Sequence, residues 1–232
     1  MIRTLALAAA AFTASAAHGG DRRYAVGDFD RVIVEGPYAV TLTVGPPSSA
    51  IGRGSSQALE AVTVDVQGTT LRIRRNRSAW GGTPGRAPEP ATIALTTRNL
   101  RLARVIGAGS LDLSGARGLR VDLSVEGSGL LRGRALAADT LAIGLRGSGS
   151  FELAGNAKVV TADLQGSGSV DAGALTTETA TILAATSGNV SLSARRAAKV
   201  TANGLGEIVV TGTPACTISG PAAAQVRCGT QR

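Results

Sequence analysis

The chain carries few side chains that could do covalent or metal chemistry. Cys216 and Cys228 are its two cysteines and His18 is its one histidine. Two cysteines near the end of an exported chain, with no histidine close by, favour one disulfide in an oxidising compartment over a zinc site. His18 lies beside a predicted signal cleavage site, where nothing would position it for Ser-His-Asp, Cys-His or histidine–metal chemistry. We therefore predict no metal and no cofactor.

Carboxylates are the remaining candidates for acid–base chemistry, as in β-helix enzymes that act on polysaccharides. Here the acids are predicted to face arginines on neighbouring repeats, a setting expected to keep carboxylates ionised and poor proton donors. Glu152 and Asp171 are examples of carboxylates on which an enzyme would depend. Aromatic residues make up 3% of the chain, which leaves few platforms for sugar rings. We predict no catalytic residue and a non-enzymatic protein. A polysaccharide-acting enzyme is kept as the alternative.

The positions of the carboxylates and arginines follow a tripeptide that recurs about every 20 residues. It begins at 107, 127, 147, 166, 186 and 204, as GAG, GSG, GSG, GSG, TSG and GLG. A near-constant period of this size is typical of a solenoid, in which each repeat forms one coil. The predicted fold class is all-β: a β-solenoid similar to a parallel β-helix, with coils of about 20 residues and Gly-Ser-Gly corners.

Glycine suits such corners because it reaches positive φ without a steric penalty and lets stacked backbones approach closely. The four middle serines, from Ser128 to Ser187, could form a hydrogen-bonded column along the corner. The corners lack the aspartate of calcium-binding β-rolls and the third glycine of a dinucleotide-binding loop. The predicted structural corner glycines are Gly107, Gly109, Gly127, Gly129, Gly147, Gly149, Gly166, Gly168, Gly188, Gly204 and Gly206.

Apolar and polar residues alternate on both sides of each corner. Leu123 and Val125 precede the corner at 127–129, Leu131 follows it, and the matching positions of other repeats are apolar or small. This period of two predicts half-buried strands. We expect the apolar positions to point inward and to stack as ladders between coils about 4.8 Å apart.

The intervening positions are polar and should point outward. Asp112, Arg132 and Glu152 occupy one such position in three successive coils, and Glu126 and Arg146 occupy another. Opposite charges on neighbouring strands stabilise a register weakly and penalise a shifted one. We interpret both sets as solvated charge ladders.

Residues 1–16 have the pattern of a signal peptide. Arg3 precedes an apolar run from Leu5 to Ala14, and small residues offer cleavage after Ala16. The run is shorter than the ~20 residues that span a bilayer, and no later segment is long enough to do so as a helix. We predict an exported protein that is periplasmic, associated with the outer membrane, or secreted.

Residues 24–230 are predicted to form a single β-solenoid domain. Alternation at Val62–Val66 and Leu71–Ile73 around the turn QGTT predicts a hairpin or two successive strands. Residues 78–90, with three prolines and Trp80, should be a Pro/Gly-rich excursion from the coil. Residues 213–230 should form a C-terminal cap closed by the Cys216–Cys228 disulfide.

The formal net charge of +8 does not predict a nucleic-acid partner. Its 24 basic residues are scattered and include two lysines, Lys158 and Lys199, whereas a nucleic-acid reader would show a basic stripe with stacking aromatics. A basic surface of this kind favours anionic envelope polymers.

The sequence resembles a bacterial family called putative auto-transporter adhesin, head GIN domain, from about Phe29 to Cys228. The resemblance is carried by FDRVIVEGPYAVTLTVG at 29–45, TLRI at 70–73, GSGSFEL at 147–153, GSGSVDA at 166–172 and GTPACTISG at 212–220. It implies a β-solenoid with an adhesive or scaffolding role, and it offers no catalytic residues. The TSG and GLG repeats depart from the pattern, which predicts that the solenoid loosens or ends near them.

The predicted function is that of a non-enzymatic envelope or secreted protein that presents a repetitive face for adhesion or assembly. Its expected partners are an envelope polymer, a glycan or a surface protein. Besides the enzyme, the alternative is a periplasmic binding partner of an envelope signalling system. The oligomeric state does not follow from the sequence.

Overall fold

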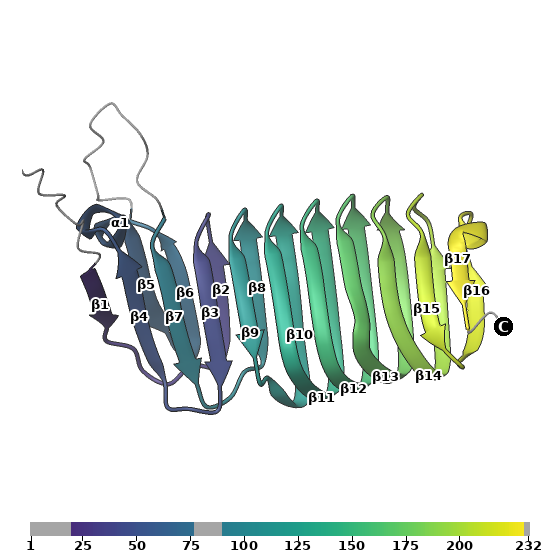
Figure 1. Ribbon diagram of the computed structural model, residues 1–232, viewed down its shortest axis with the longest axis horizontal. Coiled ribbons are helices and arrows are strands. Elements are labelled where there is room, and N and C mark those ends of the chain that lie inside the picture. Colours follow the sequence, from purple (N-terminus) through teal and green to yellow (C-terminus); the bar gives the residue numbers. More distant parts are fainter. Residues whose placement is uncertain (1–19, 77–89, 230–232) are drawn as a thin grey trace, which may run out of the picture.

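The computed structural model describes residues 20–76 and 90–229 and confirms the predicted all-β solenoid. The described residues are 72% strand and wind through about six turns. The strands of the described ranges join one 17-stranded sheet that coils along the long axis of the molecule (Figure 1). The predicted signal peptide at 1–16, His18, and Trp80 with nearly all of the 78–90 excursion lie outside the described residues.

Each coil of the repeat region has two limbs that meet at a glycine corner. The strand before the corner ends at the first residue of the corner tripeptide. The strand after the corner begins within two residues of the end of the tripeptide. In Figure 1 these corners form the row of short loops at the upper edge. The strands are β8 (Leu102–Gly107), β9 (Ser110–Ser114), β10 (Arg117–Gly127), β11 (Leu130–Gly147), β12 (Ser150–Gly166), β13 (Ser169–Thr186) and β14 (Val190–Ala202).

The coils stack in parallel, one repeat apart. Gly127 of β10 pairs with Gly107 of β8 on one side and with Gly147 of β11 on the other. β11, β12 and β13 each continue around the opposite edge without a break, so one strand supplies both limbs. The sequence period therefore matches the pairing register.

The core is a thin layer between the two limbs. The predicted inward ladder is confirmed: Val125, Leu145 and Leu164 are fully buried in successive coils. Phe151 and Val170, on the limb after the corner, are buried as well. Aliphatic side chains make up most of this layer, and Phe151 is the largest side chain fully buried in it.

The N-terminal part is not stacked in chain order. β2 (Arg31–Glu35) and β3 (Ala39–Val44) form a coil that pairs with β8 and β9 on one side. On its other side lie β6 (Thr70–Arg75) and β7 (Thr92–Thr97), which come later in the chain. The coil of β6 and β7 therefore lies between the coil of β2 and β3 and the N-terminal end of the solenoid.

The chain reaches that end by reversing direction. β4 (Ser49–Gly54), the short helix α1 (Ser56–Glu60) and β5 (Val62–Gln67) form this segment, in which β4 runs antiparallel to β7 and β5 antiparallel to β6. β1 (Gly20–Tyr24) pairs antiparallel with β4. These strands pair antiparallel, unlike the coils of the repeat region, and the predicted hairpin at β5 and β6 is confirmed. Ala58 and Leu59 of α1 are buried against the end of the core.

The expected loosening at the TSG and GLG repeats is not seen, and the last strands of the described solenoid follow directly after the GLG corner. β14 pairs in parallel with β15 (Ile208–Gly212) and β16 (Ala215–Ser219), and β15 pairs with β17 (Val226–Cys228). Between β16 and β17 lies the 3₁₀ helix η1 (Ala223–Gln225). Thr186, where other corners have glycine, is buried, and its hydroxyl hydrogen-bonds within the corner.

Candidate functional site

The predicted charge ladder on the limb after the corner is present. Arg132 Nε donates a 2.8 Å hydrogen bond to Glu152 Oε2, and Arg132 Nη1 lies 3.7 Å from Asp112 Oδ1. The hydrogen bond to Glu152 is the main cause that raises the pKa of Arg132 above its ordinary value. We call Asp112, Arg132 and Glu152 the face ladder. It holds Arg132 in place across three coils.

The second predicted charge pair does not form. Glu126 and Arg146 are neighbours in the register of β10 and β11. Glu126 instead pairs with Arg104 at 3.7 Å, and Arg146 pairs with Asp163 at 4.0 Å. Both pairs are diagonal across adjacent strands, because a long arginine side chain can reach beyond the residue directly opposite.

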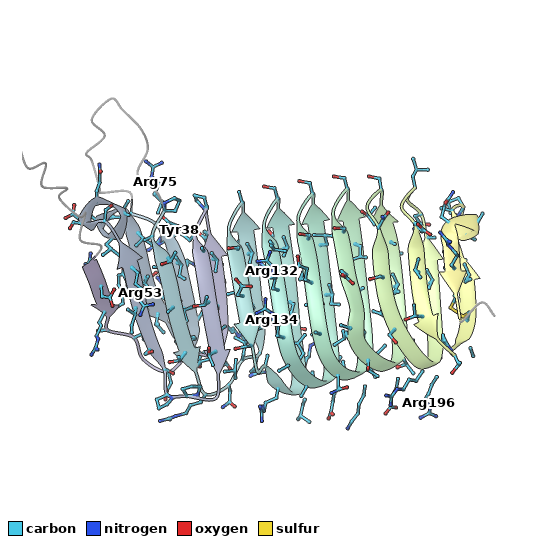
Figure 2. All side chains as sticks on the ribbon, in the orientation of Figure 1. Tyr38, Arg53, Arg75, Arg132, Arg134 and Arg196 are labelled. Atoms are coloured by element: carbon cyan, nitrogen blue, oxygen red, sulfur yellow. A yellow bond between two sulfur atoms is a disulfide. The ribbon has the colours of Figure 1, made fainter. Side chains whose placement is uncertain are left out.

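Two shallow hollows flank Arg132 and Arg134 on the face ladder's surface. The hollow of about 190 Å³ is lined by Thr41, Thr43 and Ser114 together with Asp112. The other hollow, of about 180 Å³, is lined by residues that include Glu152, Ala154, Asp171 and Ala174. Both arginines line both hollows. We call this surface the arginine face, and Figure 2 shows its two arginines near the middle of the molecule.

Arg134 differs from Arg132 in having its charge free. Its side chain is exposed, and no acidic group within residues 20–76 and 90–229 forms an ion pair with it. A guanidinium presents a planar fork of donors that suits carboxylates and other oxyanions. Arg134 is therefore available to an anionic group from outside, whereas Arg132 is already paired.

The carboxylates proposed for the enzyme alternative are both occupied by hydrogen bonds. Glu152 accepts from Arg132, and Asp171 accepts from Ser191 Oγ at 2.7 Å and from the backbone N–H of Gly173 at 3.2 Å. Glu152 is 53% exposed, without the enclosed apolar setting of a general acid. In the described ranges no three His, Cys, Asp or Glu side chains gather as metal ligands would.

The corner serines are exposed but do not form the predicted column, since no hydrogen bond joins one of these hydroxyls to the next within the described chain. Instead the corner backbone bridges the coils, and Ser148 N donates to Gly127 O at 2.9 Å. The second corner glycine is needed for space: a Cβ at Gly149 would lie 2.5 Å from Gly129 O. The corner is a packing device, with its hydroxyls left to solvent.

The predicted disulfide joins Cys216 and Cys228, with a Cα–Cα distance of 6.3 Å. Cys216 pairs with Ala198 of β14, and Cys228 pairs with Val210 of β15. Ala198 and Val210 are buried on opposite limbs, whereas Cys216 is exposed and Cys228 half-buried, so the disulfide spans the two limbs over the end of the core. It links the two limbs where no further coil follows in the described structure.

Sequence reasoning missed a second charge ladder, at the edge opposite the glycine corners. It consists of Asp139, Lys158, Glu178 and Arg196, one from each of β11 to β14, and we call it the edge ladder. Lys158 Nζ lies 2.8 Å from Asp139 Oδ1, and Arg196 lies 3.7 Å from Glu178. The contact with Asp139 raises the pKa of Lys158 above its ordinary value. These residues follow the same period as the corners, so extending the repeat register to this edge would have found them.

Three residues of the edge ladder, Asp139, Lys158 and Glu178, line a hollow of about 320 Å³ together with Arg195 of β14. Its other lining residues include Ala138, Ala157, Thr177 and Asn156. The first three of these are small and buried. The hollow is a groove that crosses four coils beside a row of charges.

None of the helices in the described ranges has the length and apolar character of a bilayer-spanning segment.

Comparisons with known proteins agree with the fold. The family model described as "putative auto-transporter adhesin, head GIN domain" matches residues 28–214. A crystal structure of a "putative adhesin" from Bacteroides fragilis has a TM-score of 0.80 at 19% identity, covering 93% of this chain and 95% of that chain. A "putative lipid binding protein" from Parabacteroides distasonis has a TM-score of 0.70 at 18% identity, covering 92% and 97%. No curated protein matches. At these identities the solved structures show a shared fold.

Proposed function

Since this chain belongs to the family of the auto-transporter adhesin head GIN domain, we propose that it is a non-enzymatic adhesion or scaffold module of the bacterial cell envelope. The proposal places it outside the cytoplasm, as the predicted signal peptide implies. Its ligand is an anionic envelope polymer, such as a polysaccharide that carries carboxylates. The arginine face is the proposed binding surface.

The single observation that carries the proposal is the unpaired guanidinium of Arg134 between two hollows. Thr41, Thr43 and Ser114 line one of them, and their hydroxyls can donate to or accept from sugar hydroxyls. Arg134 would bind a carboxylate of the same polymer through a charge-assisted hydrogen bond. Arg132 is already paired with Asp112 and Glu152, so Arg134 supplies the free positive charge of this surface.

The geometry favours binding over turnover. An enzyme of the glycoside hydrolase type needs one carboxyl group as acid and another as nucleophile or base. Glu152 and Asp171 are neighbours in the register of β12 and β13, but both already accept hydrogen bonds from protein groups. Both also lie on an open surface that does not exclude water. A polymer bound there would be held and not cleaved.

The test is binding of the purified chain to polygalacturonic acid, with uncharged dextran of similar length as the control polymer. We expect saturable binding to the polyuronate that weakens as salt is added. Arg134→Gln should weaken it about tenfold, the effect of losing one charge-assisted contact. Arg23→Gln, which neutralises an exposed arginine of β1 far from the arginine face, should leave the affinity unchanged.

Three outcomes would contradict the proposal. Equal affinity for dextran would show that charge is not recognised. An unchanged affinity of the Arg134→Gln variant would place the polymer elsewhere on the molecule. Release of reducing ends from the polyuronate, abolished by Glu152→Gln or Asp171→Asn, would establish the enzyme alternative instead.

A further inference from the structure

We propose that the edge ladder is a self-complementary surface through which two copies of this chain form an antiparallel dimer. The ladder reads negative, positive, negative, positive from Asp139 through Lys158 and Glu178 to Arg196. Asp139, Lys158 and Glu178 occupy equivalent places in adjacent coils, since Ala138 pairs with Ala157 and Ala157 with Thr177. In β14 two residues, Arg195 and Arg196, lie opposite Glu178 because the register shifts there, and Arg196 forms the ion pair. The charges are therefore spaced regularly along the solenoid axis, by about 4.8 Å per coil.

A two-fold axis turns this order into its own complement. When a second ladder runs in the opposite direction, Asp139 faces the second copy's Arg196, and Lys158 faces the second copy's Glu178. Each of these contacts occurs twice, so all eight charges meet an opposite charge. A parallel dimer in register would place each charge against itself, and like charges at close distance are costly.

The alternation also selects one register. A slip by one coil in the antiparallel arrangement brings Lys158 against the second copy's Lys158, or Glu178 against its Glu178. A slip by two coils restores opposite charges but keeps only half of the contacts. The full antiparallel register alone satisfies the whole ladder.

The residues at the two ends of the ladder fit the same arrangement. Leu119 precedes Asp139 by one coil, between the pairs Gly118–Ala138 and Arg120–Thr140, and is 80% exposed. Pro214 follows Arg196 by one coil, next to the pair of Ala197 with Ala215. In the proposed dimer Leu119 faces the second copy's Pro214. This contact would cover an apolar side chain that the single chain leaves in water.

The shape of the edge supports the same occupant. All four ladder side chains are accessible, with exposures from 44% to 75%. Asp139, Lys158 and Glu178 line the hollow of about 320 Å³ together with Ala138, Ala157 and Thr177. Figure 2 shows Arg196 at the lower edge, directed away from the ribbon. The four charges are therefore accessible to a second copy.

The dimer is expected to be weak and reversible. One side chain per coil makes a narrow stripe, and interfaces below about 1,200 Å² belong to transient complexes. Exposed ion pairs each contribute little, and salt screens them. Sedimentation equilibrium of the purified chain at low salt, up to about 1 mM, should show a monomer–dimer equilibrium that shifts to monomer when salt is added.

Lys158→Glu is the first test. It replaces two attractive contacts in the dimer by two repulsive ones, so the dimer dissociation constant should rise about tenfold or more. Lys199→Glu makes the same charge change on the outer face of β14 and should leave the constant unchanged. A wild-type chain that stays monomeric to about 1 mM, or a Lys158→Glu variant that associates like wild type, would overturn the proposal.

The second test inverts the whole ladder with Asp139→Lys, Lys158→Glu, Glu178→Lys and Arg196→Glu. Every pair within the chain keeps opposite charges, so the fold is preserved, and the inverted chain should dimerise with itself. Sedimentation equilibrium of the inverted chain alone should give a dissociation constant close to that of the wild-type chain. An inverted chain that stays monomeric under conditions in which the wild-type chain dimerises would refute the antiparallel ladder.

Discussion

Thr186 Oγ1 donates a 2.9 Å hydrogen bond to the carbonyl oxygen of Gly168, one coil away. The same hydroxyl accepts a 3.0 Å bond from Gly188 N. Thr186 stands where the preceding corners have a glycine, and its side chain is buried. It replaces the flexibility of glycine by two hydrogen bonds that tie the corner to its neighbour.

Thr186→Val should destabilise the protein by about 1–3 kcal/mol, because the shape is kept while Gly168 O and Gly188 N lose a buried partner. Urea unfolding monitored by circular dichroism measures the change. Thr201→Val removes a hydroxyl from the exposed face of β14 and should cost much less. Equal losses at the two positions would contradict the role assigned to Thr186.

Gly149→Ala should cost about 3 kcal/mol or prevent the corner from closing. Its Cβ would lie 2.5 Å from both Gly129 O and Val125 Cγ1, which are held by the coil below. Gly173→Ala is the matched control, since a Cβ there meets Asp171 Oδ1 at 3.5 Å, an ordinary contact. A comparison of thermal midpoints should show a large shift for the first variant and almost none for the second.

Reduction of the Cys216–Cys228 disulfide should lower the free energy of unfolding by about 3 kcal/mol, by the loop-closure estimate for a separation of 12 residues. The loss should be local, because the bond joins the two limbs at the last layer of the core. Hydrogen exchange should quicken in β16 and β17 and stay slow in β11 and β12. Uniformly faster exchange after reduction would show that the bond matters to the whole solenoid instead.

The two tyrosines should titrate above their ordinary value while the protein is folded. Burial raises the pKa of Tyr38 and of Tyr24, and nearby Arg75 and Arg22 oppose the shift. Since the folded pKa exceeds the unfolded value of 10.0, this group's protonated form is favoured by folding. Below pH 10 both tyrosines are protonated in the folded and the unfolded state, so the free energy of unfolding does not depend on their titration. As the pH rises from 10 through the folded pKa, the unfolded state loses its tyrosine protons first, and the folded state becomes less stable.

Absorbance at 295 nm should therefore show phenolate formation at higher pH in the native protein than in denaturant. Tyr38→Phe should remove one of the two transitions. Native and denatured curves that coincide near the ordinary pKa would mean that the tyrosines are more accessible than the structure shows.

The repeat region and its face ladder follow from the amino-acid sequence alone. Each strand there pairs with the strand one period away, so the spacing of the glycine corners also sets the register of Val125, Leu145 and Leu164. Residues equivalent in sequence become neighbours in space, which is why the repeat spacing is sufficient to align Asp112, Arg132 and Glu152. The edge ladder follows the same period, so the repeat spacing could also have predicted it.

Tertiary contacts decide what periodicity does not encode. β2 finds its partners in β6 and β8, which lie far along the chain and share no repeat with it, so the insertion of β6 and β7 beside β2 and β3 had no sequence signal. Glu126 forms its ion pair with Arg104 and not with Arg146, because the Arg104 side chain reaches diagonally across the strands. The free guanidinium of Arg134 likewise depended on which acids came within reach. The spacing of the repeats determines how the coils pair. Contacts between residues far apart in the sequence determine how the N-terminal end is built and which ion pairs form.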